Sequence, residues 1–71
     1  MKPRLAITLG KNVRYFRLKK GWSQEVLAAK AEVSPNFIGY IERGERGIRI
    51  KNIEQIAFAL GIHPKDLFKG Y

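Results

Sequence analysis

Two helix starts lie close together in the middle of this 71-residue chain, and their spacing is the strongest constraint on its fold. At each start an apolar residue precedes a serine N-cap, and a second apolar residue follows at the fourth helical position, which is the pattern of a hydrophobic staple. The residues are Trp22, Ser23 and Leu27 at the first start, and Val33, Ser34 and Ile38 at the second. The connection between the two helices must be short, and a short connection forces a sharp corner.

The two helices and the corner between them occupy about residues 23–43, and helical periodicity continues on both sides of this unit. A first helix is predicted over residues 5–19, and a fourth helix carries one apolar face, made by Ile53, Ile56, Ala57 and Leu60. A short fifth helix is predicted with His63 as its cap and Pro64 at its first position. Because the sequence has no alternating strand pattern, it predicts an all-α fold of five helices, in a single domain over residues 1–71.

The composition limits how so small a domain can be stabilised. A domain of this size buries only ~60% of the surface that its unfolded chain exposes. The chain has no cysteine and one histidine, so neither disulfides nor the usual zinc ligands are present. We therefore expect no metal and no cofactor, and we expect stability to come from packed helices and from a partner subunit.

The charge balance points to a polyanionic partner. Lysine and arginine total 14 against 6 acidic residues, which gives a formal net charge of +8. Such an excess suits DNA, RNA or an anionic lipid surface. RNA and membrane are the weaker alternatives, because Tyr40 is the one aromatic available for stacking on the predicted recognition helix and the basic residues do not form one cationic amphipathic helix.

Other classes of protein fit the residues poorly. An enzyme is not expected, because Asp66 and His63 are the one aspartate and the one histidine, and no glycine-rich phosphate loop is present. No apolar stretch approaches the ~20 residues of a membrane span. The N-terminus lacks the apolar region of a signal peptide. The sequence therefore predicts a cytoplasmic or nucleoid-associated protein.

The helix predicted over residues 34–43 has one apolar and one polar face. A helical projection places Phe37, Ile38 and Ile41 toward the core. The opposite, exposed face is predicted to carry Asn36, Gly39 and Arg43, with Pro35 and Tyr40 flanking them. An asparagine amide can bond bidentately to an adenine edge, and a glycine permits close approach of the helix. This geometry predicts a recognition helix that enters the major groove of double-stranded DNA.

Basic residues around this helix are predicted to bind phosphate. The predicted contacts are Arg14, Gln24, Arg43, Arg46 and Lys51. Gln24 stands at the first position of its helix, where the helix N-terminus also favours an anion. Glu42 would repel phosphate, but it projects near the core edge, as does Arg17 of the first helix. We therefore predict a structural Arg17–Glu42 salt bridge.

The chain resembles the Cro and lambda-repressor type of helix-turn-helix regulators, also called the xenobiotic-response-element family. The resemblance spans residues 9–68 and is carried by Gly21-Trp22-Ser23-Gln24-Glu25, Leu27-Ala28, Val33-Ser34, Phe37-Ile38, Tyr40-Ile41-Glu42-Arg43-Gly44, Ile56-Ala57 and Ala59-Leu60-Gly61. Residues 43–53 look most like the controller proteins of restriction–modification systems. That resemblance implies a small dimer reading a palindromic operator, phosphate binding by Gln24 and Arg43, and a contact of Arg46 with the DNA backbone or a base. It also implies an Arg17–Glu42 bridge, and it implies that the residues facing DNA bases are Pro35, Asn36, Gly39 and Tyr40.

Apolar residues near the C-terminus suggest how two copies would meet. A homodimer interface is predicted at Ile62, Leu67, Phe68 and Tyr71, together with the end of the fourth helix; the alternative is that these residues close the monomer's own core. The main alternative function is an antitoxin that binds both DNA and a toxin protein. RNA polymerase is a further candidate partner of a transcription regulator.

Overall fold

Four α-helices and one short 3₁₀ helix make up the fold, which a computed structural model describes for residues 2–45 and 47–71. The elements in chain order are α1 (Arg4–Lys19), α2 (Gln24–Ala31), α3 (Pro35–Glu42), α4 (Ile50–Leu60) and the 3₁₀ helix η1 (Pro64–Phe68). Neither described segment contains a strand, so the all-α class is confirmed. The fifth predicted helix is a 3₁₀ helix, a form that proteins use in short pieces such as this one.

The predicted helix starts coincide with side-chain caps. The Ser23 hydroxyl accepts a hydrogen bond from the Val26 N–H at 3.1 Å, and the Ser34 hydroxyl accepts one from the Phe37 N–H at 3.1 Å. Near the end of the chain, His63 and Asp66 form a reciprocal capping box at the start of η1. These caps satisfy backbone donors that a helix leaves unpaired at its first turn, so they fix where α2, α3 and η1 begin, whereas α1 and α4 begin without a side-chain cap.

The corner between α2 and α3 is tight because α2 ends on a left-handed residue. Glu32 has a φ of 59°, and the N–H of Val33 returns to the Ala28 carbonyl oxygen at 3.0 Å. Left-handed backbone at the end of a helix turns the chain sharply, and it satisfies carbonyl groups that the last turn leaves free. Ser34 then caps α3 directly, so only a short, sharp connection separates the two helices.

A single apolar core joins all five elements. Its buried side chains are Leu9, Val13, Leu27, Ala28, Ala31, Ile38, Ile41, Ile56, Ala57, Leu60 and Leu67. Ile38 and Ile41 belong to it, as the projection of α3 predicts, and Phe37 packs against it from the edge. No helix of the described part is long and apolar enough to cross a bilayer.

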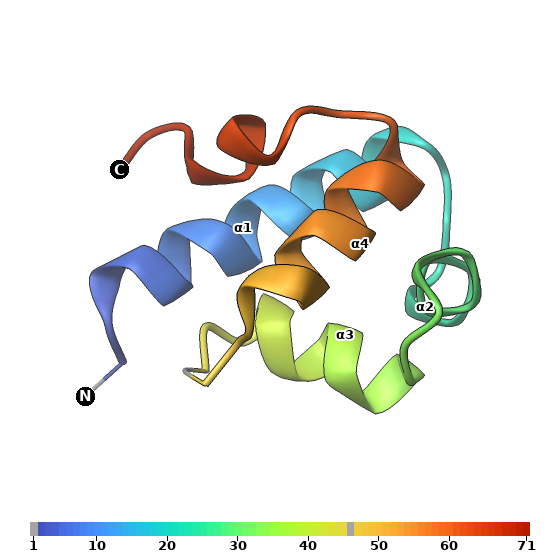
Figure 1. The fold of residues 1–71 in the computed structure, drawn as a ribbon, viewed down its shortest axis with the longest axis horizontal. Coiled ribbons are helices and arrows are strands. Elements are labelled where there is room, and N and C mark those ends of the chain that lie inside the picture. Colours follow the sequence, from blue (N-terminus) through green and yellow to red (C-terminus); the bar gives the residue numbers. More distant parts are fainter. Residues whose placement is uncertain (1, 46) are drawn as a thin grey trace.

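The packing of the helices leaves α3 at the margin of the molecule. α1 contacts both α3 and η1, and α2 contacts both α3 and α4. Figure 1 shows α3 along one side of the fold and η1 along the opposite side. One face of α3 is therefore buried against α1 and α2, while its other face points away from the protein.

The contact between α1 and the end of α3 depends on Gly10. A Cβ at this position would overlap the Ile41 carbonyl oxygen and would lie 3.0 Å from the Glu42 carbonyl oxygen. Gly10 is buried within α1, so the absence of a side chain lets the two backbones touch. This close approach sets the position of the last turn of α3 against the rest of the fold.

Candidate nucleic-acid interface

The inner side of α3 is fixed to α1 by an ion pair between Arg17 and Glu42. Arg17 Nε donates to Glu42 Oε2 at 2.7 Å, and Arg17 Nη2 donates to Glu42 Oε1 at 3.0 Å. The two side chains are only 7% and 5% exposed. Hydrogen bonding to Glu42 raises the pKa of the Arg17 guanidinium; burial opposes the rise, and the carboxylate charge adds to it. The salt bridge predicted from the sequence is therefore present, and it neutralises the acid on α3.

Glu42 also contacts two residues that are predicted to bind phosphate. Gln24 Nε2 donates to Glu42 Oε1 at 3.1 Å, and Arg14 Nη1 lies 3.9 Å from the same oxygen. Gln24 is the half-buried first residue of α2, whereas Arg14 is exposed on α1. The Gln24 amide retains a second N–H, and the Arg14 guanidinium retains donors for another acceptor. Glu42 thus brings the N-terminus of α2 and a cation of α1 to one place beside α3.

The first turn of α3 presents its polar side to solvent. Pro35 and Asn36 are both exposed, so the Asn36 amide is available as donor and acceptor, as a contact with an adenine edge requires. Tyr40 is half-buried, and its ring stacks on that of Phe37 with centroids 6.3 Å apart and an interplanar angle of 12°. The Tyr40 ring is therefore held along the flank of α3.

Gly39 is less open than the sequence suggests. A Cβ at Gly39 would lie 3.2 Å from Arg43 Nη1 and 3.5 Å from Gln24 Oε1. The backbone of Gly39 is buried, because the side chain of Arg43 folds back along α3 and the Gln24 amide approaches from α2. Two polar side chains therefore cover the backbone of Gly39, and its predicted place on the base-facing side of α3 stays a prediction.

Two other residues predicted to bind phosphate are Lys51 and Arg46. Lys51 is exposed in the first turn of α4, and Arg46 lies outside the described residues. The sequence analysis missed Lys2, whose Nζ donates to the carbonyl oxygen of Arg43 at 2.6 Å. This contact places a cation at the C-terminal end of α3, where the helix dipole favours positive charge. No sequence signal could have found it, because it joins distant parts of the chain.

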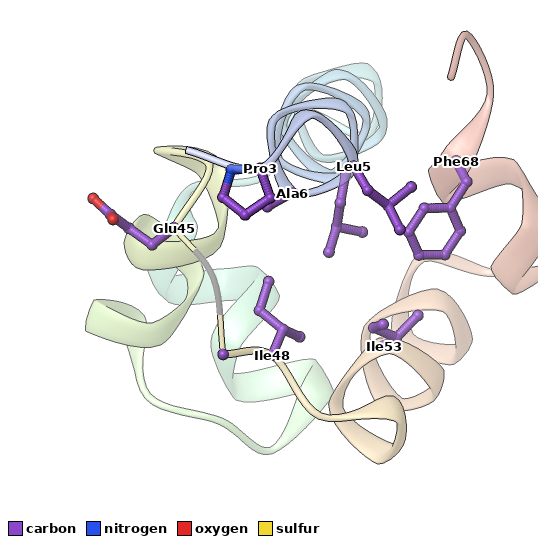
Figure 2. A pocket seen from close by; sticks show the side chains of 9 residues that line it. Pro3, Leu5, Ala6, Glu45, Ile48, Ile53 and Phe68 are labelled. Atoms are coloured by element: carbon purple, nitrogen blue, oxygen red, sulfur yellow. The ribbon is translucent and has the colours of Figure 1, made fainter. Parts of the chain in front are cut away.

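The apolar residues predicted to form a dimer interface mostly pack inside the protein. Leu67 is fully buried in the core, so its predicted place in an interface is wrong; η1 folds back on α1 and α4 and turns Leu67 inward. Ile62 is half-buried against the core. Phe68 faces a hollow of about 210 Å³ that it shares with Ile53, as Figure 2 shows. Of these four residues, Tyr71 alone is exposed.

The most exposed large apolar side chains of the described part belong to α4. Phe58 is 87% exposed and Ile50 is 77% exposed. The inner side of α4 is filled by Ile56 and Leu60, so Phe58 has to project outward. A helical projection of the fourth helix could have found these outward apolar residues. The sequence analysis named only the end of that helix as part of the interface, without its residues.

These features define the class of the protein. A helix, a tight corner and a second helix with one packed and one polar face form a helix-turn-helix domain, whose second helix can enter the DNA major groove. The sequence profile of the helix-turn-helix family HTH_3 matches residues 13–67. The chain belongs to this Cro/CI-type family, and it is a DNA-binding transcription regulator. The family is not a class of enzymes.

Individual relatives support the resemblance to controller proteins. The chain is 44% identical to control protein C.BamHI of Bacillus amyloliquefaciens over 64 residues, which cover 89% of this chain and 79% of that protein. The crystal structure of the restriction-modification controller protein C.AhdI from Aeromonas hydrophila matches with a TM-score of 0.85 at 38% identity, over 89% of this chain and 96% of that chain. The crystal structure of the hypothetical transcription factor NHTF from Neisseria matches with a TM-score of 0.87 at 37% identity, over 96% of this chain and 82% of that chain. The antitoxin alternative gains no support from these relatives.

Proposed function

We propose that this chain is a sequence-specific regulator that binds a palindromic operator as a homodimer, with α3 of each copy in the major groove. The observation that carries this proposal is the two-sided environment of α3. Its inner side is fixed by the buried Arg17–Glu42 ion pair, while Asn36 and Arg43 are exposed on the opposite side. A rigid helix with polar groups on its free side suits insertion between DNA strands. The proposed place of action is the cytoplasm, at the nucleoid.

In this proposal the outward side of α3 reads the bases. Asn36 is the residue best suited to a specific contact, because its amide can both donate to and accept from an adenine. Pro35 and Tyr40 are proposed to flank it, the first exposed and the second held along the helix. Gly39 lies between them and contributes no side chain, so specificity at that point depends on neighbouring groups or on DNA shape.

Phosphate contacts are proposed on both sides of α3. Gln24 at the N-terminus of α2, Arg14 on α1 and Arg43 at the end of α3 lie around Gly39 and Glu42. Lys51 and Arg46 are proposed to extend this surface beyond α3. A net charge of +8 supplies long-range attraction to the duplex, and each neutralised phosphate releases counterions. The proposal therefore requires steeply salt-dependent binding.

The homodimer is proposed to form through the outward side of α4. Phe58 and Ile50 are largely exposed apolar side chains on one helix, which favours a protein contact. Tyr71, from the interface predicted on the sequence, is exposed as well. Operator binding requires this two-fold contact to hold two copies of α3 on one face of a duplex, about one helical turn apart.

The decisive experiment selects bound fragments from a pool of random double-stranded DNA. The proposal expects a palindromic consensus with two half-sites about 10 base pairs apart, centre to centre. Affinity for this consensus should exceed affinity for random DNA by at least ~10³-fold, and it should fall steeply as salt rises. If the selection enriched no sequence, or if random DNA competed as well as the consensus, the proposed function would be wrong.

The dimer is tested separately by replacing Phe58 with glutamate. Because Phe58 is 87% exposed, the variant is expected to fold normally and to sediment as a monomer at concentrations where the parent protein is a dimer. Leu18→Glu is the matched control, since Leu18 is 52% exposed on α1 and receives the same change of charge. Equal effects of the two substitutions, or a parent protein that stays monomeric with operator DNA, would contradict the proposed interface.

A further inference from the structure

Gly39 stands in α3 without a conformational reason for being glycine. Its backbone is helical and does not belong to the set of glycines with a positive φ. Glycine is a poor helix former and alanine is the best one, so local propensity would favour alanine at this position. The reason for a glycine here has to come from the space around it.

The space above Gly39 is occupied by side chains from two helices. Arg43 Nη1 lies 3.2 Å from the position that a Cβ would take, and Gln24 Oε1 and Nε2 lie 3.5 and 3.8 Å from it. Arg43 reaches this point from the C-cap of α3, and Gln24 reaches it from the first turn of α2. A cationic nitrogen and an amide oxygen thus border the same point, which is a favourable arrangement of charge.

The position of the Gln24 amide is fixed from its far side. Gln24 Nε2 donates to Glu42 Oε1, and Glu42 is itself held by the buried contact with Arg17. Within residues 2–45 and 47–71, no such buried partner holds the side chain of Arg43, which is exposed. The backbone of Gly39 and the fixed Gln24 amide are therefore the surfaces against which the Arg43 guanidinium lies.

We propose that Gly39 is a positioning residue for DNA binding, because its lack of a side chain lets the Arg43 guanidinium lie against α3 beside the Gln24 amide. This inference rests on the proposed function of the same surface. In this position Arg43 and Gln24 present adjacent N–H donors to one DNA phosphate. Two donors placed before the phosphate arrives lose less side-chain entropy on binding than two mobile ones.

A methyl group at position 39 would displace the guanidinium but not the fold. The contact of 3.2 Å is tighter than usual for a Cβ, and the end of an exposed arginine can move away into solvent. Stability and affinity are then expected to change in opposite directions. The helix gains a residue of higher propensity, while Arg43 loses its place beside Gln24.

The experiment measures both quantities for Gly39→Ala, using the DNA consensus selected above. We expect the melting temperature to rise by about 4 °C, since alanine is the better helix former and the domain is small. We expect affinity for the consensus to fall about fivefold, which is in the range of couplings between residues in contact. The slope of affinity against salt should become shallower, toward that of Arg43→Ala.

A double-mutant cycle separates positioning from a direct clash with DNA. In an Arg43→Ala background, Gly39→Ala should change affinity less than twofold, because the group that it displaces is already absent. A fivefold loss that persists in that background would overturn the proposal, since the methyl would then act on the DNA itself. Unchanged affinity of Gly39→Ala alone would overturn it as well.

Gly39→Ser serves as the second variant. Serine adds a Cβ but has a lower helix propensity than alanine, so the proposal expects a smaller rise in melting temperature and a similar loss of affinity. If DNA affinity rose together with the melting temperature in Gly39→Ala and Gly39→Ser, the role of Gly39 as a positioning residue would be contradicted. If the parent protein selects no consensus, the proposed function fails; if it selects one and the cycle shows no coupling, only the inference about Gly39 fails.

Discussion

Gly10 in α1 and Gly39 in α3 are both buried helical glycines, yet the atoms around them differ in kind. At Gly10 a Cβ would meet backbone, namely the carbonyl oxygens of Ile41 and Glu42. At Gly39 the three nearest atoms belong to the ends of two side chains, those of Arg43 and Gln24. The first glycine therefore belongs to a contact that cannot adjust, and the second belongs to one that can.

This difference separates the two sides of α3. The inner side holds the helix in place through backbone contact at Gly10 and through the ion pair of Arg17 with Glu42. The outer side carries long polar side chains whose ends lie on that fixed helix. Substitutions on the inner side should therefore destabilise the fold, and substitutions on the outer side should change DNA binding without destabilising it.

The largest effect is expected for Glu42→Gln on the inner side. Removing the charge leaves the buried Arg17 guanidinium without its counter-ion, and loss of one partner of a buried pair typically destabilises by about 3 kcal/mol. Chemical denaturation should show this loss at neutral pH. Glu54→Gln is the matched control, since Glu54 is exposed on α4 and its replacement should stay within ~0.5 kcal/mol. Equal stability of the two variants would show that the buried pair contributes nothing.

The next effect is expected for Gly10→Ala, which pairs with Gly39→Ala. The new methyl must push α1 away from the end of α3, and overpacking of this kind costs about 2 kcal/mol even though alanine favours the helix. The two glycine substitutions should therefore shift the unfolding midpoint in opposite directions. Thermal unfolding followed by circular dichroism measures the two shifts. If both midpoints shifted in the same direction, the proposed difference between the two sides of α3 would be wrong.

The order and limits of the helices were open to prediction because the signals are local. Ser23, Ser34 and His63 each cap a helix with their own side chain, and the staple residues around the two serines enter the core or pack on its edge. The form of the last helix was not predictable in this way, because one turn of α-helix and one turn of 3₁₀ helix share the same caps. Its hydrogen bonding is decided by how η1 packs on α1 and α4.

The site was predictable in its residue types but not in its contacts. The projection of α3 separates Ile38 and Ile41 from Asn36, and the structure buries the first two and exposes the third. Gly39 and Arg43 share a helix face because they are four residues apart, but the contact of Gln24 with Glu42 does not follow from spacing, because it depends on tertiary packing. The predicted interface residue Leu67 failed for the same reason, since periodicity does not say on which neighbour an apolar side packs.

On the outer side, Asn36→Ala is expected to change specificity while leaving the fold intact. Asn36 is exposed, so its truncation should leave unfolding within ~0.5 kcal/mol of the parent protein. Loss of a bidentate contact should cost about 1.5 kcal/mol, at one base pair in each half-site. Binding to operators that carry single base changes checks this, because the variant should no longer distinguish the base that Asn36 reads. A uniform loss on all operators would assign Asn36 to positioning.

The smallest effect is expected for Arg43→Ala. Because a phosphate is present at every sequence, affinity should fall by about 1 kcal/mol on operator and random DNA alike, and the salt slope should decrease by ~1. Lys65→Ala is the matched control, since Lys65 is an exposed cation on η1, on the side of the fold opposite α3 in Figure 1. That control removes the same charge from the long-range field but should leave the salt slope unchanged. A loss confined to the operator would instead make Arg43 a base-reading residue, and Gly39 would then position a specific contact.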